Sequence, residues 1–204
     1  MGMEEIPETS KFKYLASTVQ EDGGCDREVK RRIQAGWSNW GKGTGVMCDK
    51  RASARLKGKL YTTVVRPAMM YGLETVALTK KQESELEVNE MRMLRWSLGW
   101  TRKDRVRNEK IRNMTGVQKF SVKTRESRLR WYGHVKRRDE GYVGKKVLGM
   151  EVQGKRKRGR PKRRWMDTIN TDMKEVGLEE EDAQDRRTWE FGIHHGNPTT
   201  CGTS

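Results

Sequence analysis

A run of positive charge is the strongest chemical feature of this sequence. Residues 155–164 read KRKRGRPKRR, and eight of these ten side chains are cationic. Each cation that neutralises a phosphate releases counterions, so such a run adds affinity for nucleic acid without sequence preference. The segment therefore predicts phosphate contacts by Lys155, Arg156, Lys157, Arg158, Arg160, Lys162, Arg163 and Arg164.

The centre of this run, residues 158–161, reads RGRP and resembles the AT-hook family. In that family an extended Arg-Gly-Arg-Pro core lies in the minor groove of A·T-rich DNA, where arginine is attracted by the negative potential of a narrow groove. A nuclear-import signal and a solvated charged loop are alternative interpretations of the same residues. Pro161 also suits the first turn of a helix, whereas hooks usually lie in disordered chain.

A second basic segment, residues 123–138, mixes cations with aromatic side chains. This composition suits single-stranded nucleic acid, because bases stack on rings while cations contact the phosphates. The alternative is that Trp131 or Tyr132 belongs to the core, and that His134 is structural rather than a ligand or general base. The residues expected to form the second binding surface are Arg128, Arg130, Trp131, Lys136, Arg137 and Arg138.

Other chemistries have little support in the sequence. His194, His195 and Cys201 match no standard zinc spacing. The glutamates of residues 83–90 are interpreted as a solvated helix face, and no phosphate-binding loop, nucleophile elbow or H-E-x-x-H motif is present. We therefore expect no metal site, no cofactor and no catalytic residue.

Charge is unevenly distributed along the 204 residues. Residues 1–100 carry a net charge of +4, residues 101–164 a net charge of +18, and residues 165–204 a net charge of −6. A positive excess in one segment predicts a polyanionic partner, either RNA or DNA. Because no stretch approaches the ~20 apolar residues of a membrane span, we expect no membrane partner and a nuclear or cytoplasmic location.

The hydrophobic pattern predicts a mostly α fold. Leu, Ile, Val and Phe make up only 34 of the 204 residues, so small local cores are expected. A short strand over 11–19 and a turn should precede a small helical bundle, followed by loosely packed basic helices and flexible loops. Apolar spacing predicts helices over 26–40, from Ser53, after Thr79, from Asp104, over 121–136, from Pro161 to Gly177, and over 179–193. Residues 139–160 are expected to form a flexible loop.

Four segments occur together, in this order, in one known family. They read FKYLAST, TVVRPAMMYGLETVAL, LRWYGHVKRR and GRPKRRWMDTI, and they begin at residues 12, 63, 129 and 159. The series resembles the C-terminal part of the reverse transcriptase of non-LTR (LINE) retrotransposons, most of all the RTE-type elements. The resemblance covers roughly residues 10–198.

The resemblance implies a domain organisation. Residues 1–22 would match the palm–thumb junction, with Phe12, Lys13, Tyr14 and Leu15 at positions of the primer grip and Ala16 in place of the usual glycine. Residues 23–100 would be the helical thumb-like domain, 101–160 a basic connector and loop, 161–198 two C-terminal helices, and 199–204 a disordered tail.

The same resemblance implies that the chain is not an enzyme on its own. Reverse transcription needs palm aspartates that hold two metal ions, and the family's Tyr/Phe-Ala-Asp-Asp motif does not occur here. We expect a non-catalytic nucleic-acid-binding fragment, with a missing palm and fingers domain as its possible intramolecular partner. The rival hypotheses are a host nuclear AT-hook-like or adaptor protein, and an enzyme with an unrecognised site.

Overall fold

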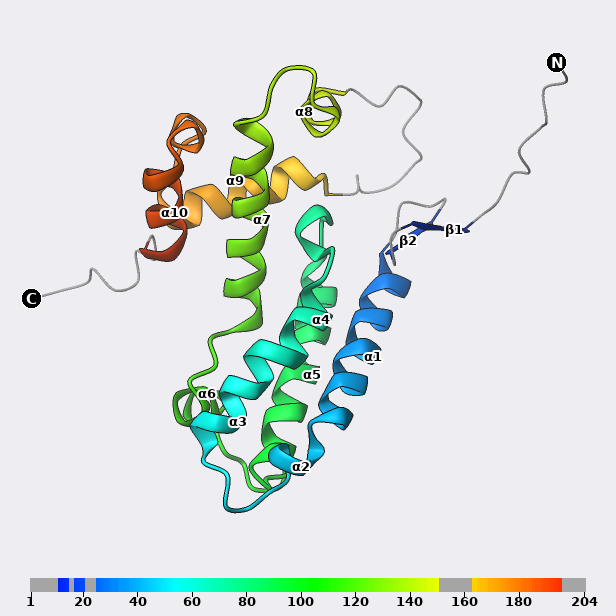
Figure 1. Ribbon diagram of the computed structural model, residues 1–204, viewed down its shortest axis with the longest axis vertical. Coiled ribbons are helices and arrows are strands. Elements are labelled where there is room, and N and C mark those ends of the chain that lie inside the picture. Colours follow the sequence, from blue (N-terminus) through cyan, green and yellow to red (C-terminus); the bar gives the residue numbers. More distant parts are fainter. Residues whose placement is uncertain (1–10, 15–16, 21–24, 151–162, 196–204) are drawn as a thin grey trace, which may run out of the picture. The chain divides into compact units, whose positions relative to one another are not determined.

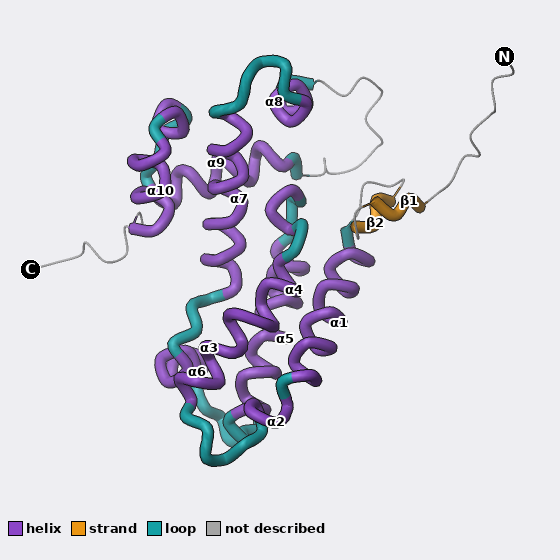
Figure 2. The backbone as a smooth tube through the Cα atoms, in the orientation of Figure 1, coloured by secondary structure: helices purple, strands orange, loops and turns teal. Residues whose placement is uncertain are grey.

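The computed structural model describes residues 11–14, 17–20, 25–150 and 163–195. These residues are mostly helical, which confirms the mostly α part of the predicted fold class (Figures 1 and 2). They form two compact units. Unit 1 consists of the described residues within Met1–Gly72 and Lys80–Val117, and unit 2 of those within Leu73–Thr79 and Gln118–Ser204.

Two short strands precede the helices of unit 1. Strand β1 (Lys11–Tyr14) pairs antiparallel with β2 (Ser17–Gln20), and Phe12 lies opposite Val19. Figure 2 shows the pair in orange. The single strand predicted over 11–19 is therefore not supported, because the four-residue strands pair with each other.

In unit 1, α1 contacts both α4 and α5, and α6 contacts both α3 and α5 (Figure 1). The bounds of its helices are α1 Asp26–Lys42, α2 Thr44–Met47, α3 Ala54–Leu60, the π-helical turn η1 Tyr61–Val65, α4 Arg66–Met70, α5 Lys80–Ser97 and α6 Asn108–Thr115. The predicted stripe of α1 is confirmed in its main part, since Val29, Ile33 and Trp40 are buried. Asp26 is the first residue of α1, and its Oδ1 accepts a hydrogen bond of 2.8 Å from Gln82 Nε2 of α5.

The apolar face predicted for the second helix is wrong. In the helix predicted from Ser53, four-residue spacing places Leu56, Leu60, Val64 and Ala68 on one apolar face, but Leu56 and Val64 are 50% and 40% exposed. The buried stripe lies one position later, at Tyr61, Val65 and Met69. It begins with residues that a hydrophobic pattern does not reveal, Lys57 and Gly58.

Specific close contacts explain why those two residues are buried. Lys57 Nζ donates to the Ser97 carbonyl oxygen at 2.6 Å, which satisfies the charge. A Cβ atom on Gly58 would lie 1.9 Å from the Thr115 carbonyl oxygen, so only glycine allows α6 to approach here. Tertiary contacts of this kind override the local apolar pattern.

Helical geometry continues through Pro67, although a proline inside a helix is expected to kink or end it. Proline lacks the N–H that the preceding helical turn requires. The turn before it, Tyr61–Val65, is π-helical, so the α-helical hydrogen-bond pattern is already interrupted ahead of Pro67. The helix then ends at Met70, and Gly72 adopts a left-handed φ of 74°.

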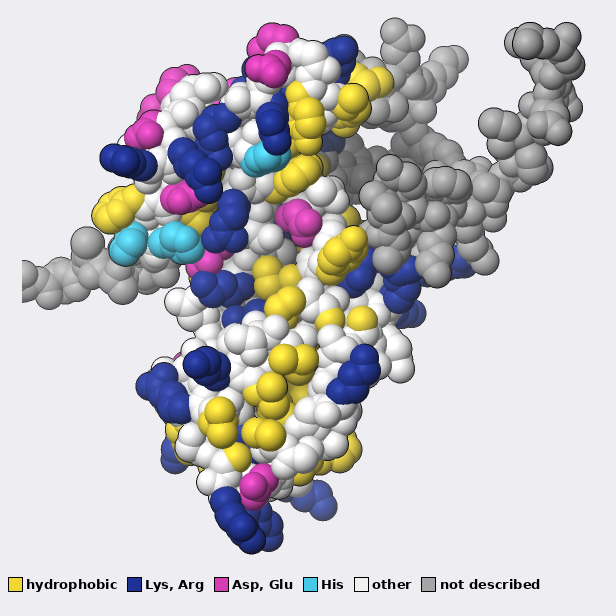
Figure 3. All heavy atoms as spheres, viewed as in Figure 1, with side chains coloured by type: hydrophobic (Ala, Val, Ile, Leu, Met, Phe, Trp, Pro, Cys, Tyr) yellow, Lys and Arg dark blue, Asp and Glu magenta, His cyan; other side chains and the backbone are white. Residues whose placement is uncertain are grey.

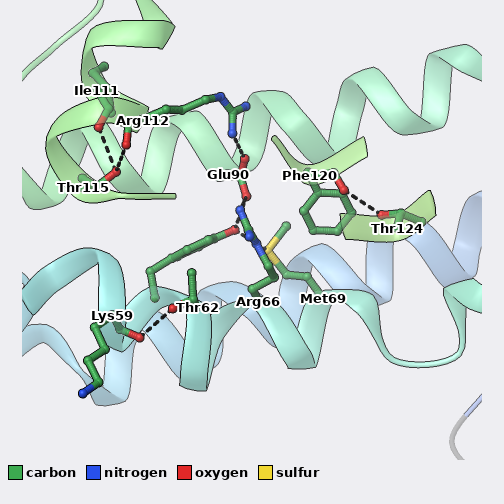
Figure 4. A network of polar contacts seen from close by, with 11 residues as sticks. Lys59, Thr62, Arg66, Met69, Glu90, Ile111, Arg112, Thr115, Phe120 and Thr124 are labelled. Carbon is green, nitrogen blue, oxygen red and sulfur yellow. Dashed lines mark hydrogen bonds and ion pairs between the residues drawn. The ribbon is translucent and has the colours of Figure 1, made fainter. Parts of the chain in front are cut away.

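A buried carboxylate joins three helices of unit 1. Glu90 of α5 is fully buried, and its Oε1 lies 2.6 Å from Arg66 Nη2 of α4. Its Oε2 lies 2.5 Å from Arg112 Nη1 of α6, and the Tyr61 hydroxyl donates to Oε1 at 3.1 Å. Figure 4 shows the two guanidinium groups reaching the carboxylate from opposite sides.

Unit 2 is built on one long helix, α7. Its elements are η2 Leu73–Thr75, α7 Phe120–Lys136, α8 Val143–Leu148, α9 Trp165–Val176, η3 Glu181–Gln184 and α10 Arg186–His195. The buried cluster consists of Leu129, Tyr132, Ile169, Met173, Val176, Ala183, Trp189 and Ile193. Trp189 Nε1 donates to the Leu129 carbonyl oxygen at 2.9 Å, and the indole lies against Gly133, where a Cβ would be 2.3 Å from Nε1.

The predictions for unit 2 are partly confirmed. Helix α7 matches the predicted 121–136, and α9 ends as expected at Gly177, whose φ is 69°. The acidic helix predicted over 179–193 is interrupted, because Asp185 accepts from the backbone N of Thr188 and so caps α10. The loop predicted over 139–160 contains α8 in its described part, so that prediction is wrong there.

The helix predicted from Asp104 in unit 1 also starts elsewhere. Helix α6 begins at Asn108, and Asp104 instead accepts from the backbone N of Thr101 at 2.6 Å. The hydrogen bonds that Thr101 donates through its backbone N and its hydroxyl lower the pKa of the Asp104 carboxyl below its usual value. Asp104 therefore stabilises a loop and does not cap a helix.

Candidate nucleic-acid interface

Helix α7 of unit 2 has one buried side and one basic side. Leu129, Tyr132 and Val135 are buried. Arg130 and His134 lie four residues apart, which places them on one face of the helix, and Arg138 follows shortly after its last residue, Lys136. Figure 3 shows Lys and Arg side chains gathered over α7 and α10 on the face toward the viewer, with acidic side chains among them.

A groove of about 600 Å³ lies along this basic side. It brings together the C-terminal half of α7, the start of α10 and the short helix η2, all within unit 2. Its lining residues are Glu74, Ser127, Arg130, Trp131, His134, Arg137, Arg138, Arg186 and Glu190.

Two aromatic rings stack in this groove. The ring centroids of Trp131 and His134 are 5.5 Å apart, with an angle of 23° between the ring planes. His134 Nε2 lies 3.4 Å from Arg138 Nε, which can donate to it when the imidazole is neutral. Trp131 is half-buried, so one part of the indole is fixed by the protein while another part faces the groove.

The charge of the groove is positive despite two carboxylates. Four arginines line it against Glu74 and Glu190. Glu190 Oε1 accepts from Arg186 Nε at 2.9 Å. This hydrogen bond, together with the charges of Arg186, Arg130 and Arg137, lowers the pKa of Glu190, which therefore stays ionised at neutral pH. With His134 neutral, the lining carries a formal charge of +2.

The remaining residues predicted on α7 are placed differently. Arg128 is buried, and its Nε and Nη2 bind the Asp172 carboxylate at 2.7 and 3.1 Å. The Arg128 guanidinium is therefore bound inside unit 2. The predicted contact with a phosphate would require its ion pair with Asp172 to break. Lys136 forms an ion pair with Glu180 and lies 6.0 Å from the centre of the Tyr132 ring. Arg137 lines the groove while its Nη1 donates to the Ala183 carbonyl oxygen at 2.7 Å.

Only the end of the basic run 155–164 is described. Arg163 and Arg164 are exposed at the start of α9. Arg163 Nη2 donates to Thr171 Oγ1 at 3.0 Å, and the backbone N of Arg164 donates to Asp167 Oδ2 at 2.9 Å. The predicted contacts of Lys155, Arg156, Lys157, Arg158, Arg160 and Lys162 lie outside the described residues, as does the predicted tail 199–204.

The primer-grip-like residues fall on the first strand. Phe12, Lys13 and Tyr14 belong to β1, and Leu15 lies outside the described residues. Backbone pairing in β1 places Lys13 opposite Thr18. Their role stays a prediction.

Sequence reasoning missed the residues that close the groove. Arg186 and Glu190 lie on α10 about 50 positions after α7, and Glu74 lies as far before it. No spacing pattern links such distant positions. A partial signal was available in Arg186, because it is one of only three cations after residue 164.

The described part of the chain offers neither clustered metal ligands nor a helix suited to a membrane. No group of three or more His, Cys, Asp or Glu side chains is placed there to hold a metal ion. None of the helices in that part combines the length and the apolar character that a membrane span needs.

The fold and the site together define a mostly helical, basic protein with an arginine-lined groove. Over 200 residues, the chain is 24% identical to an uncharacterized transposon-derived protein of Caenorhabditis elegans. The similarity covers 91% of this chain and 70% of the nematode protein. The relationship is distant, and it indicates that the chain derives from a transposon. No family model matches the chain. No solved structure matches it either.

Proposed function

We propose that this chain is a non-catalytic nucleic-acid-binding protein derived from a retrotransposon reverse transcriptase, and that the groove on α7 binds single-stranded RNA or DNA. The single observation that carries the proposal is the groove itself, where Trp131 lies among four arginines. A ring beside several guanidinium groups matches a base stacked next to its phosphates. The transposon-derived relative supports the origin, and the four sequence segments support the reverse transcriptase family.

In this proposal the exposed arginines of unit 2 contact the phosphates in different ways. Arg130 and Arg138 contact phosphates, because both are exposed and both line the groove. Arg186 exchanges Glu190 for a phosphate at a small cost, since exposed ion pairs contribute little. Arg163 and Arg164 extend the positive surface from the start of α9.

The proposal leaves polymerisation to other domains. The paired palm aspartates of the parent family are absent from this sequence, so palm and fingers domains would be its functional partners. In this arrangement the chain holds nucleic acid and does no chemistry on it.

A salt titration of the full chain tests binding. Fluorescence anisotropy with a labelled single strand of about 16 nucleotides should give a log Kd that rises linearly with log[KCl] between about 50 and 200 mM. Replacing Arg130 and Arg138 together by Ala should reduce the slope by about 1.4, which is two contacts at about 0.7 each on single strands. Trp131→Ala should weaken binding by about 5- to 150-fold, the range measured for loss of one stacked base.

Arg187→Ala is the matched control. Arg187 is exposed beside Arg186 but does not line the groove, so this variant loses the same charge without losing a contact. A slope that is unchanged in the double variant, or equal effects of Arg187→Ala and Arg186→Ala, would contradict the proposal. Preference for A·T-rich duplex over single strands would instead favour the AT-hook-like alternative.

A further inference from the structure

A cluster of tryptophans in unit 1 has no counterpart among the residues predicted to bind. Trp37 and Trp40 of α1 pack against Trp96 of α5, and the ring centroids of these three indoles are 5.7 to 6.2 Å apart. Helices α1 and α5 lie side by side, which brings the rings together (Figure 1). Trp40 is buried, whereas Trp96 is 62% exposed. An indole held on one side by two others and open on the opposite side is a rigid stacking platform.

The end of α5 builds a depression next to this platform. Gly99 adopts a φ of 72°, and the backbone N of Trp100 donates to the Arg95 carbonyl oxygen at 2.9 Å, which turns the chain back after the helix. A Cβ on Gly99 would meet no atom within 4 Å, so the space above it is open. The depression has a volume of about 560 Å³, and Trp37, Trp96 and Trp100 all line it.

The rim of the depression is cationic. Arg92, Arg95 and Arg102 line it, and no Asp or Glu is among its described lining residues. Arg92 and Arg102 are exposed. Arg95 is held in place by hydrogen bonds of 2.8 Å to the Val106 carbonyl oxygen and 2.7 Å to Asn108 Oδ1. The site therefore combines an aromatic floor with a positive edge.

We propose that this depression binds one unstacked base of a single-stranded nucleic acid. The base stacks on Trp96, and Arg92 and Arg102 contact the phosphates on either side of it. A planar base covers the exposed indole, while the arginines match the charge of the flanking backbone. An acidic peptide would use the arginines but would leave the flat aromatic surface without a matching partner. The site lies wholly in unit 1, so it is independent of the groove in unit 2.

A base-stacking probe tests the site in the full chain. We would use a single strand with one 2-aminopurine, whose fluorescence is quenched on stacking, and would measure affinity by anisotropy on the same strand. Trp96→Ala should remove most of the protein-induced quenching and weaken binding by about 5- to 150-fold. Trp96→Phe should restore much of both, because the ring face is kept. Affinity for a blunt duplex should change by less than about twofold, since its bases are not available.

Two further variants keep the test decisive. Arg92→Ala changes an exposed residue and should preserve the fold. It should weaken binding, and it therefore tests the site even if Trp96→Ala is unstable. Leu56→Ala, also in unit 1 and 50% exposed, is the apolar control and should have no effect. Wild-type affinity and quenching in both Trp96→Ala and Arg92→Ala would overturn this inference alone, provided that the α7 variants still lose binding. Equal losses for single strand and duplex, or tighter binding of an acidic peptide than of the single strand, would also overturn it.

Discussion

Replacing Glu90 by Gln should destabilise unit 1 more than replacing any other glutamate of α5 by Gln. The change keeps the shape of the side chain and removes its negative charge. Arg66 Nη2 and Arg112 Nη1 would then face a neutral amide. Because Arg66 is only 4% exposed, its positive charge would remain buried. Breaking a buried pair by removing one partner costs about 3–5 kcal/mol, because the remaining charge is left buried without compensation.

That cost is large compared with the total stability of a domain, which is about 5–15 kcal/mol. With a urea dependence of about 2 kcal/mol per M, the unfolding midpoint should fall by about 2 M. The assay is urea unfolding followed by circular dichroism at 222 nm, with tryptophan fluorescence as the second probe. Agreement of the two probes tests whether the unfolding is two-state.

Glu85→Gln is the matched control on the same helix. Glu85 is only half-buried, so the same chemical change there should alter the free energy of unfolding by less than about 0.5 kcal/mol. If Glu90→Gln also costs less than about 1 kcal/mol, the ion pairs of Arg66 and Arg112 add nothing net to stability. The argument that a shared carboxylate joins α4, α5 and α6 would then be refuted.

Three other substitutions test unit 2. Gly133→Ala should lower the free energy of unfolding by about 1–3 kcal/mol, because its Cβ would lie 2.3 Å from Trp189 Nε1, and unchanged urea unfolding would contradict this packing. Gly177→Ala should cost about 1 kcal/mol through the φ of 69° alone, since nothing lies within 4 Å of the added Cβ, and a stabilising effect would exclude that geometry. Burial, with the charges of Glu180 and Glu181, raises the pKa of Tyr132 to about 12. The folded protein thus favours the neutral phenol. The contribution of Tyr132 to the free energy of unfolding is fully present below pH about 10 and is lost as the pH rises toward 12. Tyr132→Phe should reduce that loss when urea unfolding is compared at pH 8 and pH 11, and an identical loss in both proteins would disprove the assignment.

Local patterns predicted the helices whose burial follows apolar spacing. Val29, Ile33 and Trp40 of α1 are such a case, and so are Ile169, Met173 and Val176 of α9 with Gly177 after it. The pattern failed where burial depends on a partner far away in the sequence. Lys57 is buried because the Ser97 carbonyl receives its charge, and Gly58 because the backbone of α6 touches it. Neither partner can be read from the residues around position 57.

The candidate site shows the same limit. The basic and aromatic composition of α7 was visible in the sequence, and it led to Arg130, Trp131, Arg137 and Arg138, which line the groove. Composition could not separate these from Arg128, whose guanidinium binds Asp172, 44 residues later. The tryptophan platform of unit 1 was missed because Trp37 and Trp96 belong to different helices, and their spacing within each helix resembles that of core residues.

The short segment Leu73–Thr79 has a consequence for how the chain is made. It lies between two parts of unit 1 but belongs to unit 2, where the Glu74 carbonyl oxygen accepts a hydrogen bond of 2.9 Å from Trp165 Nε1, 91 residues later. During synthesis this segment must wait until α7 and α9 have left the ribosome before it can find its neighbours. Cutting the chain after Val117 would therefore give a C-terminal piece that lacks part of its own interior, and a version that carries residues 73–79 on a flexible tether should refold where that piece does not.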